Sequence, residues 1–139
     1  NGSFVARPGC MPVVTTCDVE ASLGTEQMLL LDLRARERYL GRVEPIDPVA
    51  GHVPGAVSAP FSAHLGADGR FLPAAELRRH FSGLLGAHPV ADVVCMCGSG
   101  VTACHGIFAL ELAGWPGASL YAGSWSEWIR AAERPIAHE

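Results

Sequence analysis

The stretch that decides the fold is Val93–Cys104, which reads VVCMCGSGVTAC. Its first four residues are apolar, as in a strand that is buried on both faces of a parallel sheet. The Gly-Ser-Gly run at 98–100 predicts a tight loop, because glycine adopts backbone angles that other residues avoid. The residues that follow, Thr102 to Ala113, predict a helix that Gly114 ends. A buried strand, a glycine-rich loop and a helix in this order are typical of an α/β sheet.

Strands and helices alternate on both sides of this stretch. Met28–Leu33 (MLLLDL) has the apolar character of a second buried strand, and residues 41–55 are rich in Gly and Pro, which predicts an irregular loop. The predicted strands are 13–15, 28–33, 56–59, 92–96 and 119–121, and the predicted helices are 18–23, 34–39, 73–85, 102–113 and one that begins at Ser124. This alternation favours an α/β fold with a parallel sheet.

Length and charge limit the classes of function. The 139 residues are enough for one domain with its own core, and 49% hydrophobic against 17% charged residues indicates a globular chain. The net charge is −4 and no basic run occurs, which argues against nucleic acid as a partner. No apolar run approaches the length that spans a membrane, so no membrane partner is expected.

The cysteines favour reduced thiols over disulfides. Five cysteines is an odd count, whereas a disulfide framework in a short secreted chain usually has an even one. We therefore expect a cytoplasmic protein. Cys95, Cys97, Cys104 and His105 lack the paired Cys-x2-Cys spacing of zinc sites, so no metal is expected. Residues 1–11 are expected to be a loose lead-in or linker to a single domain within 1–139.

Cys97 is the candidate nucleophile. It stands where a buried strand ends, and ligands of open parallel sheets bind beyond that end of the strands. The loop glycines let several N–H groups converge, and the following helix adds its free N–H groups and the positive end of its dipole. Such a cradle favours an anionic thiolate that attacks a sulfane sulfur and then holds a persulfide. The alternative is a buried thiol in an ordinary strand-to-helix turn.

The loop Cys97–Cys104 resembles the active-site loop of the thiosulfate and 3-mercaptopyruvate sulfurtransferases of the rhodanese family. Further stretches resemble this family in order and spacing: Asp32–Arg34, Arg38–Gly41, Gly51–Ala56 (GHVPGA) and Gly123–Trp128. The resemblance extends from about Thr16 to Trp128. It implies a rhodanese fold, with a central, mostly parallel sheet of about five strands flanked by helices on both faces. It also implies the C-terminal, catalytic half of a two-domain enzyme, with another rhodanese domain before it.

The resemblance also assigns roles to individual residues. It makes Cys97 the residue that carries the persulfide and Arg38 the residue that binds the anionic end of the donor. Asp32 is expected to support the active loop, and Arg34 to be structural. The remaining substrate-binding residues would be Gly98, Ser99, Gly100, Val101 and Thr102 of the loop. No organic cofactor is implied.

The sulfur donor and acceptor stay open. Members that prefer thiosulfate usually carry basic residues after the loop cysteine, and Gly98 with Ser99 is more similar to the mercaptopyruvate enzymes. Those enzymes often have a second arginine in the segment that reads Glu44–Pro48 here, which contains none, although Arg42 is a possible substitute. The donor is therefore expected to be thiosulfate or 3-mercaptopyruvate, and the acceptor cyanide, a small thiol or a thioredoxin-like protein.

Several alternatives compete with this enzyme. The chain could be a relay that takes a persulfide from another protein, or a non-catalytic regulatory module, although such modules usually lack the loop cysteine. A cysteine phosphatase needs Cys-x5-Arg to clamp phosphate, and Ala103 stands where that arginine would be. His52 could be a general base, but a hydrogen bond within its turn is the favoured role.

Overall fold

The computed structural model describes residues 3, 5, 9 and 11–138. Most of the expected lead-in at 1–11 lies outside the described residues. None of the helices within the described residues is long and apolar enough to cross a membrane.

Within the described residues, five strands form one sheet in which every pair of neighbours is parallel. The strands are β1 (Val13–Val14), β2 (Leu29–Asp32), β3 (Val57–Ser58), β4 (Val93–Met96) and β5 (Ser119–Tyr121). Their order across the sheet is β1-β5-β4-β2-β3. All five were expected from the sequence, and the parallel α/β architecture is confirmed.

The helices also lie close to their predicted positions. They are α1 (Thr16–Ser22), α2 (Arg36–Tyr39), α3 (Ala74–Leu85), α4 (Val101–Leu112) and α5 (Ser124–Trp128), with 3-10 turns η1 (Phe61–His64) and η2 (Val90–Asp92) that the sequence did not predict. Helix α1 begins two residues earlier than predicted because Thr15 and Asp18 form a capping box. Pro73 is the N-cap of α3 rather than its first residue.

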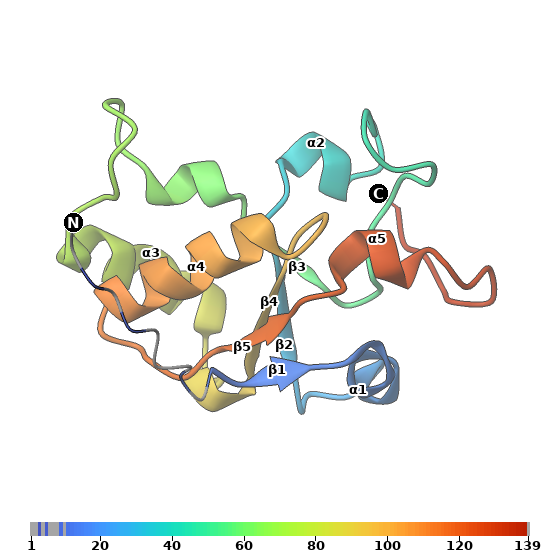
Figure 1. Ribbon diagram of the computed structural model, residues 1–139, viewed down its shortest axis with the longest axis horizontal. Helices are drawn as coiled ribbons and strands as arrows, with labels where there is room; N and C mark the ends of the chain where they lie inside the picture. Colours follow the sequence, from blue (N-terminus) through green and yellow to red (C-terminus); the bar gives the residue numbers. More distant parts are fainter. Residues whose placement is uncertain (1–2, 4, 6–8, 10, 139) are drawn as a thin grey trace.

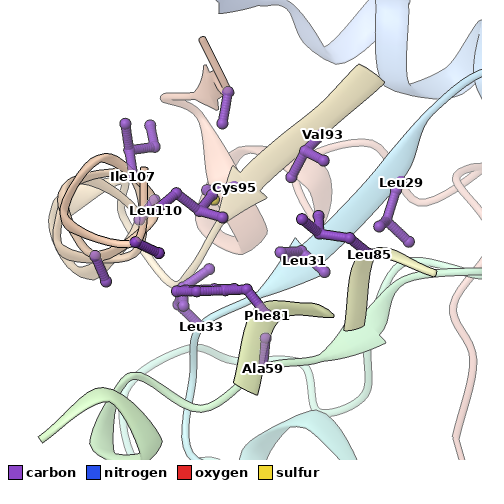
Figure 2. Packing of buried hydrophobic residues seen from close by; sticks show 14 of the residues in the cluster. Leu29, Leu31, Leu33, Ala59, Phe81, Leu85, Val93, Cys95, Ile107 and Leu110 are labelled. Atoms are coloured by element: carbon purple, nitrogen blue, oxygen red, sulfur yellow. The ribbon is translucent and has the colours of Figure 1, made fainter. Parts of the chain in front are cut away.

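Neighbouring side chains of the buried strands pack on opposite faces of the sheet. Cys95 lies in one apolar cluster with Phe81 of α3 and Ile107 of α4, and Figure 2 shows these side chains together. Met96, the next residue of β4, lies in a second cluster with side chains of α1, α2 and α5. Helices therefore cover both faces, as predicted: α3 and α4 cover one, and α1, α2 and α5 cover the other.

The connections that follow the neighbouring strands β2 and β4 lead away in opposite directions from the same end of the sheet. After β2 the chain passes through α2 to β3, and after β4 it passes through α4 to β5, on the other side. A sheet whose strand order reverses in this way has a crevice beyond its carboxyl ends. The loop from β4 to α4 reaches toward α5 in Figure 1, and the amide of Trp125 donates a hydrogen bond to the carbonyl of Cys97 there.

Candidate active site

A pocket of about 210 Å³ opens at this crevice. The segment after β2, the loop after β4 and helix α5 supply its walls. It is lined by Arg38, Ile46, Asp47, Cys97, Gly98, Ser99, Val101, Thr102 and Ser126. The fold thus brings Cys97, Arg38 and four of the five predicted loop residues to one pocket. Gly100 and Asp32 are buried and are not among the lining residues.

The backbone of Cys97 is fixed on both sides. Its amide donates to the Oγ of Ser124 at 3.1 Å, and its carbonyl accepts from the amide of Trp125 at 3.0 Å. The residue is 2% exposed and belongs to the apolar cluster beneath α4, yet it also lines the pocket. A molecule that reacts with this thiol must therefore enter the pocket to reach it.

Ser124 is a positioning residue that the sequence analysis missed. It is fully buried, and its hydroxyl donates to the carbonyl of Tyr121 at 2.8 Å while accepting from the amide of Cys97. Its φ of 52° is positive, which no other described residue besides glycine shares. The sequence places Ser124 at the start of a helix, but nothing in the sequence shows that its hydroxyl reaches the other loop.

The loop after Cys97 leaves a row of backbone N–H groups without protein acceptors. Within the described part of the chain, the amides of residues 98–103 donate no hydrogen bond. Gly100 turns the chain into α4 with a φ of 84°, and a Cβ there would lie 2.7 Å from the carbonyl oxygen of Ala122. Unpaired amides and the positive end of the α4 dipole favour an anion in the adjoining pocket.

Arg38 of α2 faces this loop, but much of its guanidinium is already occupied. Its Nε donates to the two carboxylate oxygens of Glu44 at 3.0 and 3.1 Å. Its Nη2 donates to Glu44 Oε1 at 2.7 Å and to Asp47 Oδ2 at 3.0 Å. Nη1 donates to no other described residue, and it lies 3.5 Å from the position that a Cβ on Gly98 would take. Nη1 is therefore the group that remains available to a bound anion.

The carboxylate of Glu44 holds the guanidinium of Arg38 in place, and this role was not predicted from the sequence. Besides Arg38 it accepts hydrogen bonds from the amides of Ile46 and Asp47, both at 3.1 Å. Burial raises the pKa of Glu44, but the hydrogen bonds from Arg38 and the two amides outweigh it and hold the pKa below its ordinary value. Glu44 is therefore a charged, fully bonded support for Arg38.

Asp47 joins the segment after α2 to helix α5. Its Oδ1 accepts from the Oγ of Ser126 at 2.8 Å, and the amide of Ser126 in turn donates to the carbonyl of Gly98. Asp47 was not predicted from the sequence, because the family resemblance implied an arginine in this segment. The available signal was a pair of acids three residues apart, Glu44 and Asp47, in a proline-containing loop that follows Arg38.

Asp32 supports the site from behind. It is fully buried and accepts from the Nε and Nη2 of Arg34 at 3.0 and 2.6 Å. Arg34 also donates to the carbonyl of Gly51, lies 3.5 Å from Glu44, and stacks over the ring of Trp125. The structural role predicted for Arg34 fits these contacts, and Asp32 is linked to the pocket residue Arg38 through Arg34 and then Glu44.

Two other candidates take part in packing. The Nδ1 of His52 lies 2.8 Å from the carbonyl oxygen of Tyr39, and the two rings stack, which fits the hydrogen-bonding role predicted for His52. Burial, followed by the nearby Cys104 and Cys97, raises the pKa of Cys95 to about 12, so this thiol is neutral. Over the described residues, no three His, Cys, Asp or Glu side chains are grouped to hold a metal ion.

Comparison with known proteins points to one family. Residues 15–131 match the model of the Rhodanese-like domain. The chain is 54% identical over 136 residues to a probable 3-mercaptopyruvate sulfurtransferase of Pseudomonas aeruginosa, covering 98% of this chain and 48% of that protein. It is 42% identical to a putative thiosulfate sulfurtransferase of Mycobacterium tuberculosis, covering 81% of this chain and 39% of that protein.

A solved structure supports the same conclusion. The Tum1 protein from Saccharomyces cerevisiae superposes with a TM-score of 0.77 at 27% identity, covering 91% of this chain and 46% of that one. The chain spans about half the length, or less, of the curated relatives named above. The five-stranded parallel sheet and the family match over 15–131 together show that the chain belongs to the family of rhodanese-like domains.

Proposed function

We propose that this chain is a sulfurtransferase that carries sulfur as a persulfide on Cys97. The observation that carries the proposal is that Cys97 lines the same pocket as Arg38 and as residues of the loop at 98–103, whose amides have no acceptor among the described residues. Anion-stabilising groups in the same pocket suit a nucleophile that is anionic before and after it accepts a sulfur atom.

In the first step, the Cys97 thiolate attacks the outer sulfur of the donor. With thiosulfate, a new S–S bond forms, the donor's own S–S bond breaks, and sulfite leaves with the bonding electrons. With 3-mercaptopyruvate, the C–S bond breaks instead, and the thiol proton ends on the carbon of the departing pyruvate. Arg38 binds the anionic end of either donor through Nη1, and the amides of the loop stabilise the terminal sulfur of the persulfide.

In the second step, a nucleophilic acceptor attacks the outer sulfur of the persulfide. Cyanide gives thiocyanate, and a thiol gives a new persulfide, while Cys97 returns to the thiolate. The proposed acceptors are cyanide, a small thiol or a thioredoxin-like protein. Ser99 is exposed and lines the pocket, which supports the proposal that its hydroxyl hydrogen-bonds the donor.

The proposal extends to the setting of the domain. The named relatives are about twice as long as this chain, which supports its being one half of a two-domain enzyme, and the resemblance of its Cys97 loop is the ground for proposing the C-terminal, catalytic half. A persulfide carrier needs a reduced thiol, and the four cysteines within the described residues are free, which supports a reducing compartment such as the cytoplasm.

The test is the formation of a persulfide at Cys97. After incubation with thiosulfate or 3-mercaptopyruvate and removal of the donor, intact-mass analysis is expected to show a gain of about 32 Da, the mass of one sulfur atom in a covalent intermediate. Cyanide should then remove this mass and release thiocyanate. Cys97→Ser abolishes both signals, while Cys104→Ser, which changes an exposed cysteine outside the pocket lining, keeps them.

Other results point to different functions. Sulfur uptake from a protein persulfide but from neither small donor would favour the relay. Equal signals from the wild type and Cys97→Ser would mean that another cysteine carries the sulfur or that none does, and the proposal would fail. If the folded wild-type protein takes up no sulfur from any donor, the remaining interpretation is a non-catalytic module.

A further inference from the structure

Two side chains of opposite charge line the same pocket as Cys97. Arg38 is the one basic residue of the pocket lining and is 15% exposed, whereas Asp47 is the one acidic residue of the lining and is 9% exposed. Glu44 lies behind them and is 5% exposed. The single positive charge of Arg38 is thus shared between two carboxylates before any donor binds.

The two carboxylates differ in what holds them. Glu44 is fixed by two amides and by the bidentate contact with Arg38, and it does not line the pocket. Asp47 lines the pocket, and its side chain accepts only from Arg38 Nη2 and from Ser126 Oγ. A Cβ on Gly98 would lie 3.5 Å from Arg38 Nη1 and 3.9 Å from Asp47 Oδ2. An anion bound against the loop therefore meets both the arginine and the aspartate.

The charge of the donor decides how strongly Asp47 affects binding. Thiosulfate carries two negative charges near neutral pH, and a donor with a single carboxylate and a protonated thiol carries one. Repulsion from a fixed carboxylate a few ångströms away grows with the charge of the ligand, and the partly buried side chain of Asp47 is screened less by salt than an exposed carboxylate is. Asp47 therefore weakens the binding of a dianion more than it weakens the binding of a monoanion.

We propose that Asp47 is a specificity-determining residue that selects singly charged carboxylate donors over dianions by offsetting part of the charge of Arg38 inside the pocket. This inference rests on the proposed sulfurtransferase function. It adds to that function one residue that selects sulfur donors by their net charge. Ser126 is the positioning residue that holds Asp47 in the pocket wall.

The test compares two donors on three proteins. The value of kcat/KM for thiosulfate and for 3-mercaptopyruvate is measured at low ionic strength, with cyanide as acceptor, on the wild type, Asp47→Asn and Asp68→Asn. In a two-step transfer this value reports the donor half-reaction alone. Asparagine keeps the size of the side chain and can hydrogen-bond both Arg38 and Ser126, so the change removes mainly the charge.

We expect Asp47→Asn to raise the thiosulfate-to-mercaptopyruvate ratio of kcat/KM about tenfold, the effect of one unit charge acting at a few ångströms in a partly buried site. Asp68→Asn is the matched control, because Asp68 is an exposed carboxylate that is not among the pocket lining. It should leave the ratio at the wild-type value. If Asp47→Asn is not folded by circular dichroism, Asp47→Ala is measured in its place, with the same expectation.

Two failures can be told apart. A wild type that transfers sulfur, together with a folded Asp47 variant whose donor ratio stays within twofold of the wild type, overturns the role of Asp47 and leaves the sulfurtransferase intact. A wild type whose Cys97 gains no sulfur from either donor overturns the proposed function and the inference with it.

Discussion

At the scale of single residues, the site depends on buried side chains that do not line the pocket. Ser124 is the clearest case, because its hydroxyl connects the Cys97 amide to the carbonyl of Tyr121 inside the protein. A buried donor or acceptor that loses its partner costs free energy, since no water replaces the bond. One hydroxyl therefore contributes both to stability and to the position of the nucleophile.

Ser124→Ala is expected to lower the free energy of unfolding by about 1–3 kcal/mol, because it leaves a buried N–H and a buried carbonyl without this partner. It should also slow persulfide formation, since the backbone of Cys97 is held on one side only. Urea denaturation and the rate of mass gain measure the two effects. Ser82→Ala removes an exposed serine hydroxyl on α3 and should change stability by less than about 0.5 kcal/mol. Equal stability of the two variants would contradict the role of Ser124.

At the scale of elements, helix α4 holds the active loop against the sheet through a close contact. Gly106 of α4 is buried, and a Cβ built on it would lie 2.9 Å from the Cδ1 and Cγ of Leu33, which follows β2. Leu33 is itself fully buried, so it has little room to move. The absence of a side chain at 106 lets α4 pack closely against the chain that leads from β2 to the pocket.

Gly106→Ala is expected to destabilise the protein by about 1–3 kcal/mol, the usual cost of overpacking a filled core. Gly83→Ala in helix α3 makes the same chemical change where a Cβ meets nothing within 4 Å. There the higher helix propensity of alanine should stabilise the protein by up to about 1 kcal/mol. The midpoints of urea unfolding should therefore move in opposite directions, and a shift of the same sign in both variants would contradict the close contact.

At the scale of the whole molecule, a cluster of histidines joins η1, α3 and α4. His64 is fully buried, and its ring lies 5.4 Å from that of His80 and 5.5 Å from that of His105, measured between ring centroids. Neither ring nitrogen of His64 has a hydrogen-bond partner among the described residues. Burial, and then repulsion from His80 and His105, lowers the pKa of His64 to about 4.

The sign of the pH effect follows from this shift. Because the pKa of His64 is lower in the folded state than its ordinary value of 6.5, the unfolded chain takes up the proton first as the pH falls. The stability that the neutral form provides is fully present above about pH 6.5 and is lost as the pH falls toward 4, by up to about 3 kcal/mol in total. Lowered pKa values of His80 and His105, both caused chiefly by burial, act in the same direction.

The measurement is the free energy of unfolding in urea between pH 7 and pH 4. His64→Leu is expected to weaken the loss of stability across this range, because it removes the most strongly shifted histidine of the cluster. Ile107→Val, in the same core, should cost about 1 kcal/mol equally at every pH. An unchanged pH dependence in His64→Leu would show that this histidine is not the cause.

Local sequence determined the secondary-structure elements and pointed to Cys97 as the proposed nucleophile. The apolar runs around Leu31 and Val94 are too short for helices and too apolar for exposed strands, so only a buried parallel sheet accommodates them. The glycine-rich loop after Cys97 follows directly from the glycines themselves, because their backbone freedom is a property of the residue. For these features the determining interactions lie within a few residues along the chain.

Only the tertiary structure decided what surrounds the nucleophile. The carboxylates of Glu44 and Asp47 share the guanidinium of Arg38, and the hydroxyl of Ser124 supports Cys97 from 27 residues further along the chain. These partners meet because β2 and β4 finish at the same end of the sheet and their connections diverge there. Hydrogen bonds and ion pairs depend on distances in space, and distances across a crevice are set by the packing of the whole sheet rather than by any local pattern.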